Sequence, residues 1–92
     1  MQIRISYATQ IRQLTGASSE MLTLEESSSV QDLVDVLCNR HGDDLRAALC
    51  ESGGQLRRSL ILCINDQHVL DVDQQRLTDG DELLIMSALS GG

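Results

Sequence analysis

The first part of the chain follows a strand pattern and then a connection. Apolar and polar residues alternate over the first seven positions, which predicts a strand with one buried and one wet face. Residues 9–16 are predicted to be a connection that Ile11 and Leu14 hold against the core. Ser19–Leu24 follows as a second strand, so the two strands are expected to form a hairpin with a long loop.

The clearest element is a helix over residues 30–41. Ser29 and Asp32 imitate a capping box, with the shorter Asp in place of the usual Glu. Gly42 stands where a helix commonly ends. One helical stripe carries the apolar side chains and ends on His41: Val30, Leu33, Val34, Leu37 and Cys38.

The second half of the chain reads as a shorter helix and three strands. Asp43 or Asp44 is predicted to cap the helix. The strands are Leu60–Ile64, a weak one at Val69, Leu70 and Val72, and Leu83–Met86. Turns are predicted at Asn65-Asp66 and at Asp79-Gly80. Strands that flank one main helix indicate an α+β fold, the β-grasp, with a mixed sheet of four to five strands packed on that helix.

Two of these strands carry apolar residues on both faces, although one helix covers only one face of a sheet. The best packing turns Leu62, Ile64, Leu83 and Ile85 toward the helix. The opposite face then presents four side chains, called the open-face patch below: Ile61, Cys63, Leu84 and Met86. An exposed apolar patch is typical of a partner-docking surface. Central strands that are simply rich in β-formers, or loops that cover them, would give the same pattern.

Charge and cysteine content limit the partners and the compartment. The chain of 92 residues has a formal net charge of −7, which would repel nucleic acid and favours a partner with a basic surface. Its three cysteines do not suggest a disulfide framework. The sequence opens on a strand pattern rather than a signal peptide, and no apolar run approaches the roughly 20 residues of a membrane span. A cytoplasmic protein without a membrane partner is expected.

Side-chain chemistry gives little support for an enzyme or a metal site. Cys38 and His41 lie three residues apart on the helix, but no second pair completes a zinc-type set, and both extend the apolar stripe. They are therefore interpreted as core residues. No arrangement of Ser, Cys, His and Asp has the spacing of a nucleophilic site. We expect no bound metal, no bound cofactor and no side-chain catalysis.

The sequence ends on Gly91-Gly92, after the last predicted strand and a short linker. Glycine usually serves backbone conformations that other residues resist, as in turns. Here the pair instead predicts a thin peptide that enters a cleft too narrow for a Cβ atom. Residues 1–87 are expected to form the β-grasp domain and residues 88–92 a flexible tail, with the carboxylate of Gly92 as the reacting group.

Several segments in this order resemble one family over essentially the whole chain. They are Ile11–Gly16, Ser29–Leu33, Cys63–Asn65, Leu77–Leu83 and Leu89–Gly92. The chain resembles the MoaD/ThiS-like ubiquitin-like sulfur carriers, and among them the small subunits of molybdopterin synthase. It departs from the latter at Ser87-Ala88, where they often have two prolines, and at Ile85 and Met86, where they often have aromatics. A tail without the prolines is expected to be less stiff.

The resemblance implies a carrier whose partners perform the catalysis. An ATP-dependent activating enzyme, similar to ubiquitin-activating enzymes, would adenylate Gly92, and sulfur from a persulfide donor protein would replace AMP. Residues Leu89, Ser90 and Gly91 would then lead the thiocarboxylate into a synthase large subunit, which passes sulfur to a pterin precursor of molybdenum cofactor. Sulfur donation to thiamine, cysteine or another metabolite, or conjugation to protein lysines, is the alternative among carriers. A β-grasp interaction module is the alternative of another class.

Overall fold

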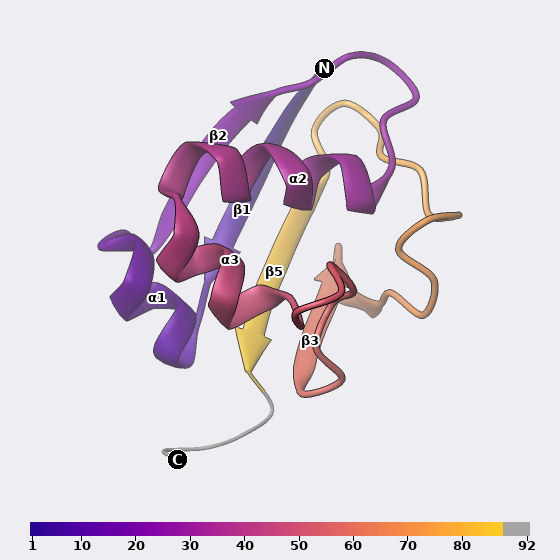
Figure 1. Cartoon of the computed structure of the whole chain (residues 1–92). Helices are drawn as coiled ribbons and strands as arrows, with labels where there is room; N and C mark the ends of the chain where they lie inside the picture. The colour runs from indigo at the N-terminus through magenta and orange to yellow at the C-terminus, as the bar shows by residue number, and fades with distance from the viewer. Residues whose placement is uncertain (88–92) are drawn as a thin grey trace.

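The computed structural model describes residues 1–87, in which a mixed sheet carries helices on one side (Figure 1). The elements are β1 (Gln2–Tyr7), α1 (Thr9–Thr15), β2 (Ser19–Thr23), α2 (Val30–His41), α3 (Asp43–Leu49), β3 (Leu60–Ile64), β4 (Gln67–His68) and β5 (Glu82–Ser87). None of these helices is long and apolar enough to cross a membrane, within the described residues.

The five strands lie in the order β2-β1-β5-β3-β4. β1 pairs antiparallel with β2 and parallel with β5, and β3 pairs antiparallel with both β5 and β4. A parallel pair needs a long crossover, and α2 and α3 supply it in front of the sheet in Figure 1. The predicted α+β, β-grasp class and the mixed sheet are therefore confirmed.

α2 begins at the predicted capping box. The Ser29 hydroxyl accepts a hydrogen bond from the backbone N–H of Asp32 (3.1 Å), and the Asp32 carboxylate accepts one from the N–H of Ser29 (2.9 Å). Hydrogen bonds from Ser29, first that of its backbone, hold the pKa of Asp32 below its usual value. Asp is long enough here to close both bonds of the box.

Gly42 joins α2 to α3. Its φ of +91° favours glycine, and its N–H donates to the carbonyl of Cys38 (2.9 Å) to end α2. The same residue is the N-cap of α3, so the prediction that Asp43 or Asp44 caps this helix was wrong. Both acids lie in the first turn instead, where the helix dipole stabilises a negative charge.

The core lies between α2 and the sheet. The α2 stripe packs toward β1, whose Ile3 and Ile5 are fully buried, and β5 contributes Leu83 and Ile85. Cys38 belongs to this core, as predicted, and burial raises the pKa of its thiol to about 11. A thiol held in its protonated form packs as a small apolar group.

Residues 9–16 are not the irregular connection that the sequence suggests, since most of them form α1. Ile11 is buried as predicted, whereas Leu14 is 46% exposed and does not anchor the segment. Gly16, at φ +73°, ends the helix with a hydrogen bond from its N–H to the carbonyl of Arg12. Two turns are too short to produce a helical period in the sequence.

The weak strand predicted over residues 69–72 is also misplaced. Asn65 and Asp66 both have positive φ angles, so they form a tight reversal that pairs Gln67–His68 with β3 immediately. Val69 then turns into the core, and Leu70 is 89% exposed. The tight turn therefore places Gln67 and His68 in the strand next to β3, and the apolar residues that follow lie beyond the end of that strand.

Truncation of Leu37 is expected to test the role of α2 as the main core helix. The side chain is fully buried, so Leu37→Ala should lower the free energy of unfolding by about 2–5 kcal/mol. Val36→Ala on the exposed side of the same helix is the control and should change it by less than about 0.5 kcal/mol. Denaturant unfolding measures both. Equal effects of the two variants would mean that α2 does not face the core as described.

Candidate functional site

The face of the sheet opposite the helices presents the open-face patch. Burial alternates along β3 and β5, with Leu62, Ile64, Leu83 and Ile85 buried. The four residues between or beside them are partly exposed: Ile61, Cys63, Leu84 and Met86. The predicted orientation of both strands is therefore confirmed. The role of the patch in docking stays a prediction.

The sheet register makes these four side chains one surface. Ile61 pairs with Met86, and Cys63 pairs with Leu84, across the antiparallel β3–β5 ladder. Directly paired side chains lie about 5 Å apart, so the two pairs form a compact block. Ser6 of β1 lies beside Leu84 in the parallel ladder and marks the polar border of the block.

The border of the patch is polar and includes two carboxylates. A shallow hollow of about 330 Å³ lies beside Cys63 and Leu84, and the carboxylates of Asp66 and Glu82 line it. Glu82 also faces the guanidinium of Arg4 at 3.7 Å, and both side chains are more than half exposed. An apolar centre with two carboxylates on one side fits a partner whose apolar surface has basic groups on the matching side.

Asn65 connects the end of β3 to the start of β5 and thereby helps to fix this surface. Its amide nitrogen donates to Asp81 Oδ1 (2.9 Å), and its amide oxygen accepts from the N–H of Glu82 (3.0 Å). Its own backbone N–H donates to the carbonyl of Glu82 (2.9 Å). The sequence predicts the turn at Asn65 but not this side-chain connection, which spans 16 residues.

The last described strand residue is held by the first turn of α1. The backbone N–H of Ser87 donates to the hydroxyl of Thr9 (3.1 Å). Residues 88–92 follow, so Leu89, Ser90, Gly91 and Gly92 lie outside the described residues and their predicted roles stay predictions. Nothing in the sequence around Thr9 indicates this bond, because its partner is 78 residues away.

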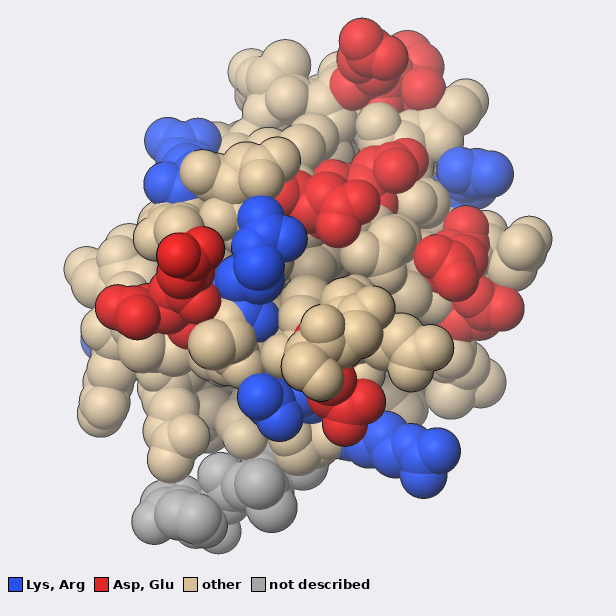
Figure 2. All heavy atoms as spheres, viewed as in Figure 1, with Lys and Arg blue, Asp and Glu red and all other residues tan. Residues whose placement is uncertain are grey.

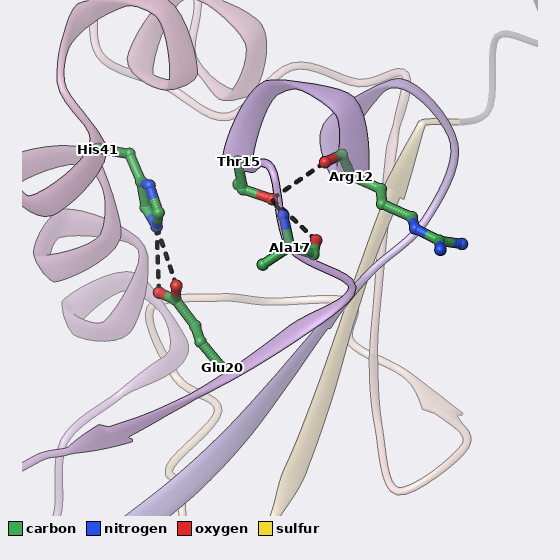
Figure 3. Close-up of polar contacts among 5 residues, drawn as sticks. All are labelled: Arg12, Thr15, Ala17, Glu20 and His41. Atoms are coloured by element: carbon green, nitrogen blue, oxygen red, sulfur yellow. Dashed lines mark hydrogen bonds and ion pairs between the residues drawn. The ribbon is translucent and has the colours of Figure 1, made fainter.

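His41 has a protein partner that the sequence did not reveal. Its Nε2 lies 3.1 and 3.2 Å from the two carboxylate oxygens of Glu20, which joins the end of α2 to β2 (Figure 3). Both side chains are mostly buried, with 19% of His41 and 16% of Glu20 exposed. His41 therefore lies at the edge of the core and makes a polar contact there instead of an apolar one. The Tyr7 ring meets the imidazole edge-on, and burial, followed by the charge of Glu20, raises the pKa of its hydroxyl.

No group of three His, Cys, Asp or Glu side chains within residues 1–87 is placed to hold a metal ion. The Glu20 contact gives His41 a structural role. The expectation of a metal-free protein stays a prediction.

Figure 2 views the face that carries the helices, where acidic and basic side chains interleave. The positive groups are all arginines, since the sequence contains no lysine. The open-face patch is the candidate docking surface because of its partly exposed apolar side chains, not because of charge.

Comparisons with known proteins agree with this geometry. A family model described as the ThiS family matches residues 5–92. The molybdopterin synthase sulfur carrier subunit of Chlamydomonas reinhardtii is 27% identical over 92 residues, and the match covers all of both chains.

Two solved structures place the fold among known proteins. The crystal structure of SAMP1 from Haloferax volcanii superposes with a TM-score of 0.89 at 18% identity, covering all of both chains. A chain of the Amycolatopsis orientalis BexX/CysO complex superposes with a TM-score of 0.74 at 26% identity, covering 98% of this chain and 99% of that one.

Proposed function

Because the chain belongs to the ThiS family of ubiquitin-like sulfur carriers, we propose that it carries sulfur as a thiocarboxylate on Gly92 and donates it in molybdopterin synthesis. One observation carries the proposal: the chain matches a molybdopterin synthase sulfur carrier subunit from end to end. The family match also includes the two final glycines. The name of that relative favours a molybdopterin precursor, rather than thiamine, cysteine or protein lysines, as the acceptor of the sulfur.

The chemistry follows from the weak reactivity of a carboxylate. At neutral pH its negative charge resists a nucleophile, and hydroxide is a poor leaving group. Transfer of AMP from ATP to the Gly92 carboxylate, with release of pyrophosphate, would supply a good leaving group. A persulfide sulfur would then attack the acyl carbon and expel AMP. Cleavage of the resulting S–S bond by a thiol would leave the thiocarboxylate, which is ionised and nucleophilic.

We assign the catalytic groups of these steps to partner proteins. The family consists of small carrier subunits that are not themselves catalytic. In the proposal, an activating enzyme and a synthase large subunit dock in turn on the open-face patch. β5 carries Leu84 and Met86 of the patch and continues directly toward residue 88. A partner seated on the patch would therefore stand beside the start of the tail.

The test is a complete loading reaction. The purified protein is incubated with its cognate activating enzyme, ATP and a persulfide donor, and its intact mass is measured. We expect a gain equal to the difference between a sulfur and an oxygen atom, located on Gly92 by fragmentation. Addition of the synthase large subunit and a pterin precursor should return the mass to its starting value. No gain would contradict the carrier role, and a gain without transfer to the pterin would contradict the pathway.

A further inference from the structure

Thr9 has a backbone conformation that its side chain disfavours. Its φ of +57° lies in the left-handed region, where a β-branched residue is a genuine outlier. The other described non-glycine residues with positive φ are Ser27, Asn65 and Asp66. Asn and Asp tolerate this region well because their short polar side chains bond locally. Strain of this kind persists only where surrounding contacts impose it, and it is common at functional sites.

The contacts of Thr9 point away from its own helix. Thr9 is the first residue of α1, and the N-cap residue Ala8 makes no side-chain capping bond. The Thr9 hydroxyl donates to the carbonyl of Ala8 (2.6 Å) and accepts the backbone N–H of Ser87 (3.1 Å). A Thr at a helix start commonly accepts from an N–H of that helix. Here the hydroxyl accepts from β5 instead.

The hydrogen bond between Thr9 and Ser87 lies just beyond the end of the parallel β1–β5 ladder. The parallel pairing of β1 and β5 ends at Tyr7 and Ile85, and the N–H of Ala8 still donates to the carbonyl of Ile85 (3.0 Å). β1 then turns into α1, so its backbone leaves the sheet. The Thr9 hydroxyl supplies the next acceptor on the β1 side and extends that contact to Ser87, while Leu60 of β3 pairs with Ser87 on the other side.

We propose that Thr9 is a positioning residue, which fixes the direction in which the chain leaves β5 and so presents the C-terminal carboxylate to the activating enzyme. This inference rests on the proposed function. Five residues, 88–92, follow Ser87, and an extended chain of that length spans at most about 17 Å. The bond therefore sets the point and the direction at which the chain leaves the sheet, five residues before the reacting group. Misplacement of a reacting group by about 1 Å is enough to slow a reaction severely.

Three substitutions separate positioning from fold stability. Thr9→Val removes the hydroxyl but keeps the shape, Thr9→Ser keeps the hydroxyl, and Thr9→Gly removes both the hydroxyl and the backbone strain. The matched control is Thr15→Val, which deletes a hydroxyl on the same helix. That hydroxyl bonds only to the nearby carbonyls of Arg12 and Ala17 and the N–H of Ala17 (Figure 3).

Two quantities are measured: kcat/KM for loading by the activating enzyme, and the rate of hydrogen exchange at the backbone N–H of Ser87. Loss of one hydrogen bond should lower kcat/KM for Thr9→Val by about three- to tenfold and speed the exchange by a similar factor. Thr9→Ser and Thr15→Val should resemble the wild type in both. Thr9→Gly should melt no lower than the wild type, because the strain is gone, and yet load as poorly as Thr9→Val. A residue that only stabilised the fold would not separate melting from loading in this way.

The outcomes distinguish this inference from the proposed function. Normal loading of Thr9→Val and Thr9→Gly would overturn the positioning role while the carrier function stood. A wild-type protein that gains no sulfur would overturn the proposed function and the role of Thr9 with it. Unchanged exchange at Ser87 in Thr9→Val would show that the hydrogen bond does not hold β5, which also overturns the inference.

Discussion

A chain lengthened by a single residue beyond Gly92 is expected to fold normally and to gain no sulfur. In the proposed chemistry the reacting group is the carboxylate of Gly92, and a further peptide bond would convert it into an amide. The added residue carries its own carboxylate, but this group would lie one residue, about 3.5 Å, beyond the position at which the activating enzyme holds the acyl carbon. The measurement is formation of the adenylate with the cognate activating enzyme and ATP, followed by intact mass. Loading of the lengthened chain, without prior trimming, would contradict the carrier mechanism.

Two controls separate this effect from a general effect of chain length. One residue inserted between Gly53 and Gly54 adds the same length in an exposed loop, where insertions are tolerated. This variant should load like the wild type. Proteolytic removal of the added C-terminal residue should restore loading to the lengthened chain.

Gly91→Val is expected to block loading as well, for a steric reason. A β-branched side chain thickens the peptide and restricts its backbone, so the tail should no longer enter a narrow cleft. Gly53→Val is the matched control, since a Cβ there would meet no atom within 4 Å and the backbone is not in the left-handed region. Both variants should melt near the wild type. Normal loading of Gly91→Val would mean that the cleft does not require glycine.

The sequence predicts best the elements whose signals are local and long. The stripe of α2 extends over three turns and has a cap at one end and Gly42 at the other, so both limits of the helix were predicted correctly. The alternation along β3 and β5 likewise gave the correct buried and exposed sides once one helix-covered face was assumed. In both cases the relevant residues are near neighbours in the chain.

The sequence-based predictions failed where an element is too short to show a period, or where a residue's conformation depends on a partner far away in the chain. α1 has two turns and buries only Ile11, which leaves no period to detect. The positions of Thr9 and His41 depend on Ser87 and Glu20, which are 78 and 21 residues away. Nothing local to either residue indicates those contacts. Propensity also failed at Val69 and Leu70, because the preceding turn had already determined the strand pairing.

Substitutions in the open-face patch are also expected to have a large effect. Leu84→Asp or Met86→Asp should weaken binding to both the activating enzyme and the synthase large subunit by at least about tenfold, because a charge buried at an interface core loses its hydration. Leu84 lies in the middle of β5 and pairs with Cys63, so its substitution tests the centre of the patch. Dissociation constants of the purified pairs provide the measurement.

The matched control makes the same chemical change on the opposite side of the molecule. Val36 is an exposed apolar residue of α2, 39% accessible, and Val36→Asp adds the same charge to a protein that already carries −7. Its affinity should stay close to that of the wild type. Melting of all three variants near the wild type would show that the sheet is intact, since the patch side chains are outside the core. If Leu84→Asp binds both partners as tightly as Val36→Asp does, the open-face patch is not the docking surface, and the partners must approach the tail from the helix-covered side.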